Sequence, residues 1–163
     1  MTERSRGSID PHANPETWAP RLQRALDDQQ ERYEQLRDLS VRQGELIRSM
    51  DTDGLLRILA RRQVLVDQIN EANQEIEPFR KEWDRLVEGL PDQHRDRLRR
   101  RIESLEEVVN EIVRRDEEDK TLLENQRTRV ASEMETVNRS RSAMNAYQRT
   151  AQTEGPRYQD RQG

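Results

Sequence analysis

The chain has 163 residues, of which 31% are hydrophobic, 4% aromatic and 38% charged, with a net charge of −4. A compact globular domain usually has about 45–50% apolar residues, so the composition excludes a thick hydrophobic core and favours thin helical rods. The two charge signs are interspersed, which gives no overall indication of nucleic-acid binding. Cysteine is absent, which excludes disulfide frameworks and thiolate chemistry.

The segment from Met1 to Ile9 lacks the apolar core of a signal peptide. No apolar run approaches the roughly 18 residues that a membrane span requires. We therefore expect a cytoplasmic protein without a membrane span.

Residues 1–16 are polar and aperiodic, and we expect them to form a disordered arm. A first helix is predicted over residues 17–50, with Thr17 as its N-cap and Pro20 in its first turn. Its apolar residues recur at alternating steps of four and three, a spacing that places them on one side of a helix. They are Leu22, Leu26, Tyr33, Leu36, Ile47 and Met50.

A second helix is predicted over residues 53–89, with Asp51 as its N-cap. Its apolar pattern continues across Pro78, which indicates a kink near residue 78 and not an end. A third helix is predicted over residues 92–151, because no Gly or Pro occurs between Asp92 and Glu154. Residues 152–163 are polar and are expected to form a loose tail.

These elements predict an all-α fold, an elongated antiparallel three-helix bundle or coiled coil with a long, projecting third helix. At 1.5 Å per residue, the first two helices would each be roughly 50–55 Å long and the third roughly 90 Å. About 30–40 Å of the third helix would therefore have no partner helix within the chain.

Two carboxylates, Asp116 and Asp119, occupy successive core positions in the heptad pattern of the third helix. A buried and unpaired Asp would cost several kcal/mol, so both side chains must reach water or a basic neighbour. One interpretation is that they mark the end of the three-helix core. The other is that they set the register of a longer bundle, as polar core residues can.

Sequence motifs typical of catalytic, metal-binding or cofactor-binding sites are nearly absent. We therefore expect that the protein is not an enzyme and has no catalytic residues, no metal site and no cofactor. The segment Asp51–Gly54 is similar to a calcium loop, but Arg62 occupies its twelfth position, so a helix cap is the better interpretation. The cluster from Arg95 to Arg101 could bind phosphates or an acidic protein. Glutamates follow it directly, which favours a solvated charged face and argues against nucleic acid.

The end of the third helix carries a thin apolar stripe. A monomer seldom leaves such a strip uncovered, so we predict that it binds a protein partner through a helix-in-groove or helix-on-helix contact. The alternative is self-burial, against the first helix or in a homodimer. The candidate partner-binding residues are Leu122, Leu123, Val130, Met134, Val137, Met144 and Tyr147.

Two segments resemble the FlgN-type flagellar export chaperones. Residues 45–69 (ELIRSMDTDGLLRILARRQVLVDQI) are similar to the middle of that family, where a leucine-rich helix, an Asp-containing turn and a Leu-x-x-Leu helix follow one another. Residues 112–134 resemble its third helix, where an acidic run precedes an Asn-x-x-Leu-Leu signature. That signature reads Asp119-Lys-Thr-Leu-Leu123 here, with Asp in place of the usual Asn. The pair Ala146-Tyr147 is also similar, and the likeness covers roughly residues 20–150.

This resemblance implies a small cytoplasmic all-helical chaperone. Such proteins bind helical terminal segments of flagellar hook–filament junction subunits, prevent premature assembly, and deliver these hook-associated substrates to the export apparatus. The family's cargo surface lies toward the C-terminal helix, which coincides with the apolar stripe. Two other classes remain open: a scaffolding coiled coil that self-associates through the third helix, and a nucleic-acid-associated protein that uses the arginine cluster.

Overall fold

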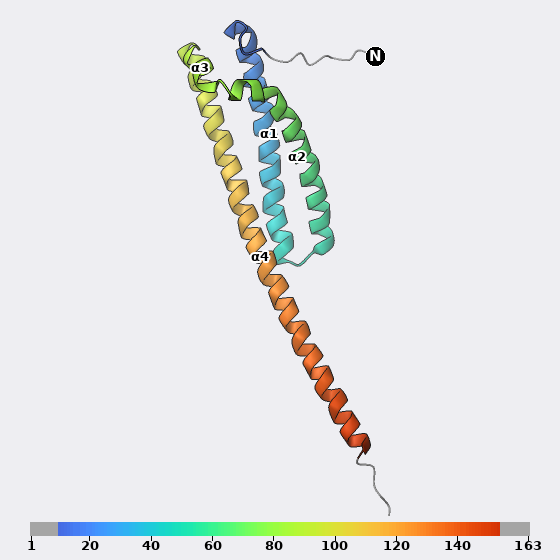
Figure 1. The fold of residues 1–163 in the computed structure, drawn as a ribbon. Helices are drawn as coiled ribbons and strands as arrows, with labels where there is room; N and C mark the ends of the chain where they lie inside the picture. The colour runs from blue at the N-terminus through green and yellow to red at the C-terminus, as the bar shows by residue number, and fades with distance from the viewer. Residues whose placement is uncertain (1–9, 154–163) are drawn as a thin grey trace, which may run out of the picture. The chain divides into compact units, whose positions relative to one another are not determined.

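The computed structural model describes residues 10–153. They form α1 (Pro15–Arg48), α2 (Thr52–Arg80), α3 (Trp83–Glu88) and α4 (Asp92–Thr153), and this part of the chain contains no strand (Figure 1). The predicted all-α fold with a long C-terminal helix is confirmed. The chain divides into two compact units, residues 1–120 and residues 121–163, and α4 contributes to both.

The two expected loose ends fall largely outside the described residues. Residues 1–9 of the expected arm and residues 154–163 of the expected tail are not described. Where the structure does describe these segments, it differs from expectation, because residues 15–16 and 152–153 are helical.

α1 begins earlier than expected because a better cap precedes it. The side chain of Asn14 accepts a hydrogen bond from the Glu16 N–H at 3.1 Å, and Pro15 occupies the first turn, where its missing N–H costs nothing. Thr17 is therefore not the cap, and its hydroxyl donates to the Asn14 carbonyl at 2.6 Å. Pro20 consequently lies inside the helix, beyond the first turn.

The turn between α1 and α2 depends on Asp51 and Gly54. The Asp51 side chain accepts a hydrogen bond from the Gly54 N–H at 2.9 Å, which confirms Asp51 as the N-cap of α2. A Cβ at position 54 would lie 2.5 Å from the Asp51 Oδ2 atom, so glycine is required for this close approach. The turn also contains Met50 in a left-handed conformation, with φ of 58°.

The prediction of one kinked helix over residues 53–89 was wrong. α2 ends at Arg80, and α3 begins at Trp83 after two intervening residues. Pro78 lies inside α2 and has no N–H to donate, which weakens the last turn of that helix. The chain consequently leaves helical geometry just after the proline instead of bending through it.

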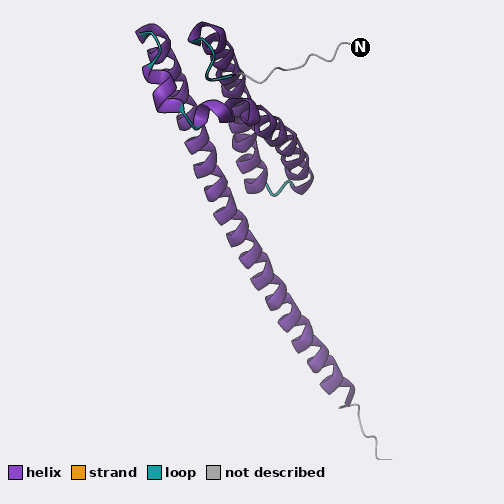
Figure 2. Ribbon diagram, turned by 45° about the horizontal axis from the view of Figure 1, so that its top comes forward, coloured by secondary structure: helices purple, strands orange, loops and turns teal. Residues whose placement is uncertain are grey.

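The core of residues 10–120 consists of two apolar clusters, one above the other along the bundle. The first joins the start of α1 to the end of α2 and the start of α4, around residues Trp18, Leu22, Leu26, Phe79, Leu98 and Leu105. The second joins later residues of α1 to the middle of α2 and α4, namely Leu36, Leu65, Ile69, Val108 and Ile112. α2 therefore runs antiparallel to both α1 and α4, as Figure 2 also shows.

Residues 121–153 of α4 form the described part of the second unit. Every residue from 127 to 153 is exposed to solvent. The apolar side chains between residues 127 and 153 are therefore all open to solvent.

Candidate functional site

A polar layer lies where the three long helices meet at the end of the first unit. Arg62 of α2 donates from Nη1 and Nη2 to the two carboxylate oxygens of Asp116 on α4, both at 2.7 Å. Arg62 Nη1 also donates to Gln43 Oε1 of α1 at 2.6 Å. The Gln43 Nε2 group in turn donates to Asp119 Oδ2 at 2.9 Å. One hydrogen-bonded chain thus links all three helices.

The two carboxylates of this layer meet different surroundings. Asp119 is 5% exposed and accepts a hydrogen bond from an amide, whereas the Asp116 side chain is 40% exposed and pairs with a guanidinium. Ile112, one turn earlier, is the last buried apolar residue of α4 among the described residues. The layer therefore closes the apolar core, and Asp116 has the basic neighbour that its position demands.

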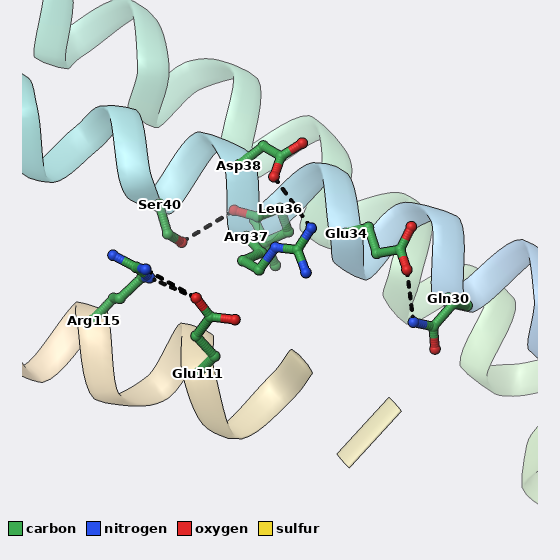
Figure 3. A network of polar contacts seen from close by, with 8 residues as sticks. All are labelled: Gln30, Glu34, Leu36, Arg37, Asp38, Ser40, Glu111 and Arg115. Carbon is green, nitrogen blue, oxygen red and sulfur yellow. Dashed lines mark hydrogen bonds and ion pairs between the residues drawn. The ribbon is translucent and has the colours of Figure 1, made fainter. Parts of the chain in front are cut away.

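The face between α1 and α4 just above this layer is also polar (Figure 3). The half-buried pair Glu111 and Arg115 on α4 meets at 2.9 Å and points toward α1. Opposite them on α1, the buried Ser40 hydroxyl donates to its own helix, to the Leu36 carbonyl at 3.1 Å. These polar side chains are therefore satisfied within their own helices.

A cleft of about 510 Å³ opens in the first unit between α1, α2, α3 and α4. Its lining combines apolar residues such as Ile76, Trp83 and Val109 with three amide side chains. One of them, Gln29, is 1% exposed and donates from Nε2 to Asn73 Oδ1 at 2.6 Å. The Oε1 atom of Gln29 is buried and has no hydrogen-bond partner among the described residues.

The arginine cluster at the start of α4 is partly neutralised by nearby carboxylates. Arg95 pairs with Asp92 on the same helix, and Arg101 pairs with Asp27 of α1 at 2.8 Å. The result matches the interpretation of this segment as a solvated charged face.

The candidate partner-binding residues all lie on the second-unit part of α4. Leu122 is half-buried, and the others are exposed by between 40% for Val130 and 77% for Tyr147. Four of them recur at seven-residue steps, and residues two helical turns apart face the same side. These four are Leu123, Val130, Val137 and Met144.

Two arginines beside this stripe were not among the residues singled out in the sequence. Arg127 and Arg141 follow Leu123 and Val137 by four residues each, one turn along the same side of the helix. With Met134 between them, they form a second row with a seven-residue step. This seven-residue period is present in the sequence, but a search restricted to apolar residues does not detect the two arginines.

Among residues 10–153, no group of three or more His, Asp or Glu side chains is arranged to hold a metal ion. No helix in this range combines the length and apolar character needed to cross a membrane.

The comparison with protein families decides the classification. The FlgN family model, described as FlgN protein, matches residues 18–155. The chain belongs to the FlgN family. This membership confirms the resemblance noted in two separate segments, and it supports a general role as a flagellar export chaperone. No curated protein and no solved structure matches the chain.

Proposed function

We propose that this FlgN-family protein is a cytoplasmic export chaperone that binds helical segments of flagellar hook–filament junction proteins. It keeps them unassembled until secretion and hands them to the export apparatus. The proposal is supported by the family match over residues 18–155 and by the exposed apolar stripe on the last part of α4. The exposed stripe is the main observation in favour of the proposed function.

The stripe has the properties of a reversible binding surface. All of its side chains except Leu122 are exposed, whereas most of the stability of a helix in a protein comes from packing of its apolar face against another surface. Covering six or seven such side chains contributes on the order of 10 kcal/mol gross, before the costs of association and ordering. Met134 and Met144 are flexible and adapt to targets of different shape.

The test is the double variant Val130→Asp and Val137→Asp in the full chain. Binding is measured by isothermal titration calorimetry against the terminal helical segments of the organism's hook–filament junction proteins. Two charges within the stripe should abolish binding and leave the far-UV circular dichroism nearly unchanged, because both residues are exposed.

The matched control is Leu56→Asp and Val64→Asp on α2, which are 60% and 58% exposed and lie outside the stripe. It should bind like the unaltered chain. Unchanged binding by the stripe variant would remove the proposed function. A collapse of helicity in that variant would show that the two valines belong to the protein's own core.

A second candidate is a scaffolding protein that self-associates through α4. The seven-residue step of Leu123, Val130, Val137 and Met144 favours it, since this is the period of a coiled-coil seam. Sedimentation equilibrium at several concentrations separates the two. A stable dimer that the two Val→Asp changes dissociate supports scaffolding, whereas a monomer supports the chaperone.

A further inference from the structure

The charges beside the stripe are distributed unevenly along α4. Residues 136–153 contain three arginines and neither Asp nor Glu, so the last turns of the helix carry a charge of +3. Arg139 is paired with Glu135 at 2.5 Å, on a different side of the helix from the stripe. Within residues 10–153, Arg127 and Arg141 are exposed and form no ion pair.

These two arginines lie along one edge of the apolar row. They are two heptads apart, which corresponds to about 21 Å along a helix axis at 1.5 Å per residue. In a pair of helices that contact through a heptad seam, residues at such flanking positions face charged residues of the partner and select it. A partner helix with lysines there would be repelled at both ends of the row.

We propose that the partner of this stripe is an acidic amphipathic helix. Its apolar residues pack on Leu123, Val130, Val137 and Met144, and its carboxylates, two heptads apart, pair with Arg127 and Arg141. This inference rests on the proposed function and specifies the chemical class of the cargo segment. The two arginines make the surface selective, whereas the apolar row alone would accept any helix with a heptad pattern.

The width of the stripe argues for a protein helix and against an anionic membrane. A helix that lies in a membrane interface buries a broad apolar face and keeps its acidic residues away from it. Here the register position beside the apolar row carries Gln126, Glu133 and Ser140. Glu133, one turn before Val137, would be driven toward the acyl chains, whereas beside a partner helix it keeps its ion pair with Arg129 at 3.7 Å.

The experiment uses two synthetic helical peptides, each about four heptads long, with Leu at both core positions. One carries Glu at all flanking positions and the other carries Lys, so that like charges limit self-association of either peptide. Binding to the full chain is measured by fluorescence anisotropy at two salt concentrations. The unaltered chain should bind the Glu peptide about tenfold more tightly than the Lys peptide, and salt should reduce the difference.

The deciding variant is Arg127→Glu with Arg141→Glu, which should reverse the preference between the two peptides. Its control, Arg139→Glu with Arg149→Glu, changes the net charge by the same amount on other sides of the helix and should keep the original preference. Equal affinity for both peptides, or reversal by the control variant, would overturn the inference. Tighter binding to anionic lipid vesicles than to the Glu peptide would overturn it too.

Failure of this inference is distinguishable from failure of the proposed function. If the two Val→Asp changes abolish binding of the junction-protein segments but the Arg→Glu changes leave the peptide preference intact, only the charge selectivity is wrong. If the Val→Asp changes leave cargo binding intact, the proposed function itself is wrong.

Discussion

Arg62 of α2 holds Asp116 of α4 through two parallel hydrogen bonds of 2.7 Å each, at the level where the apolar core of the bundle ends. The guanidinium is the more buried partner, with a side chain 13% exposed against 40% for the carboxylate. The same guanidinium reaches Gln43, and through it the buried Asp119. The pair therefore joins α2 to α4 and connects both to α1.

Removing either member of this pair should destabilise the bundle unequally. Asp116→Ala leaves the buried guanidinium without its anion and should lower the free energy of unfolding by about 2–3 kcal/mol. Arg62→Met leaves a carboxylate that water already reaches and removes one donor from the buried Gln43 Oε1 atom, and should cost about 1–2 kcal/mol. Urea unfolding followed by circular dichroism measures both. An equal loss of stability in the two variants, or a larger loss for Arg62→Met, would contradict this account of the pair.

Two buried glutamines should respond to the same substitution with opposite signs. Gln43 supplies the hydrogen bond to the buried Asp119 carboxylate. Gln43→Leu removes this donor and should lower the free energy of unfolding by about 2–3 kcal/mol. Gln29 has a buried Oε1 atom without a hydrogen-bond partner among residues 10–153. Its Nε2 group donates to the exposed Asn73 side chain and to the Ile69 carbonyl, which lies within α2. Gln29→Leu should therefore stabilise the protein by up to about 1 kcal/mol. Thermal unfolding of the two variants measures whether each is more or less stable than the unaltered chain.

Gly44 should reveal how rigidly Asp119 is held. A Cβ at position 44 would lie 3.1 Å from the Asp119 Oδ1 atom and 3.2 Å from Nη1 of the flexible Arg48 side chain, and moving the carboxylate aside would strain its bond to Gln43. Gly44→Ala should lower stability by about 1 kcal/mol, although Ala is the better helix former by a similar amount. Combined with Asp119→Ala, the same change should become stabilising. A stabilising effect in both backgrounds would show that Asp119 moves freely.

Apolar residues of the core and of the stripe should differ sharply in their effect on stability. Phe79 is fully buried, with its ring centroid 5.4 Å from that of Trp18, and Phe79→Ala should cost about 3–5 kcal/mol. Val137 is 57% exposed, and Val137→Ala should change the free energy of unfolding by less than about 0.5 kcal/mol. Denaturant midpoints measure both effects, and a large loss at Val137 would assign the stripe to the folded core.

Local signals in the sequence predicted much of the helical structure but not all of its ends. The absence of Gly and Pro between Asp92 and Glu154 correctly indicated a long final helix. The effect of Pro78 was predicted less well, because a proline can kink a helix or end it soon afterwards. Which of the two occurs depends on how the following residues pack, and here Phe79 and Val87 are both buried.

By itself, the sequence determined that the chain is a thin all-helical protein with an apolar row on its last helix. It also required that Asp116 and Asp119 find polar partners, because periodicity and the cost of burying a charge depend only on local order and side-chain type. Only the tertiary structure decided that these partners are Arg62 and Gln43. They lie on other helices, 54 and 76 residues away along the chain, and their contact depends on how three helices align.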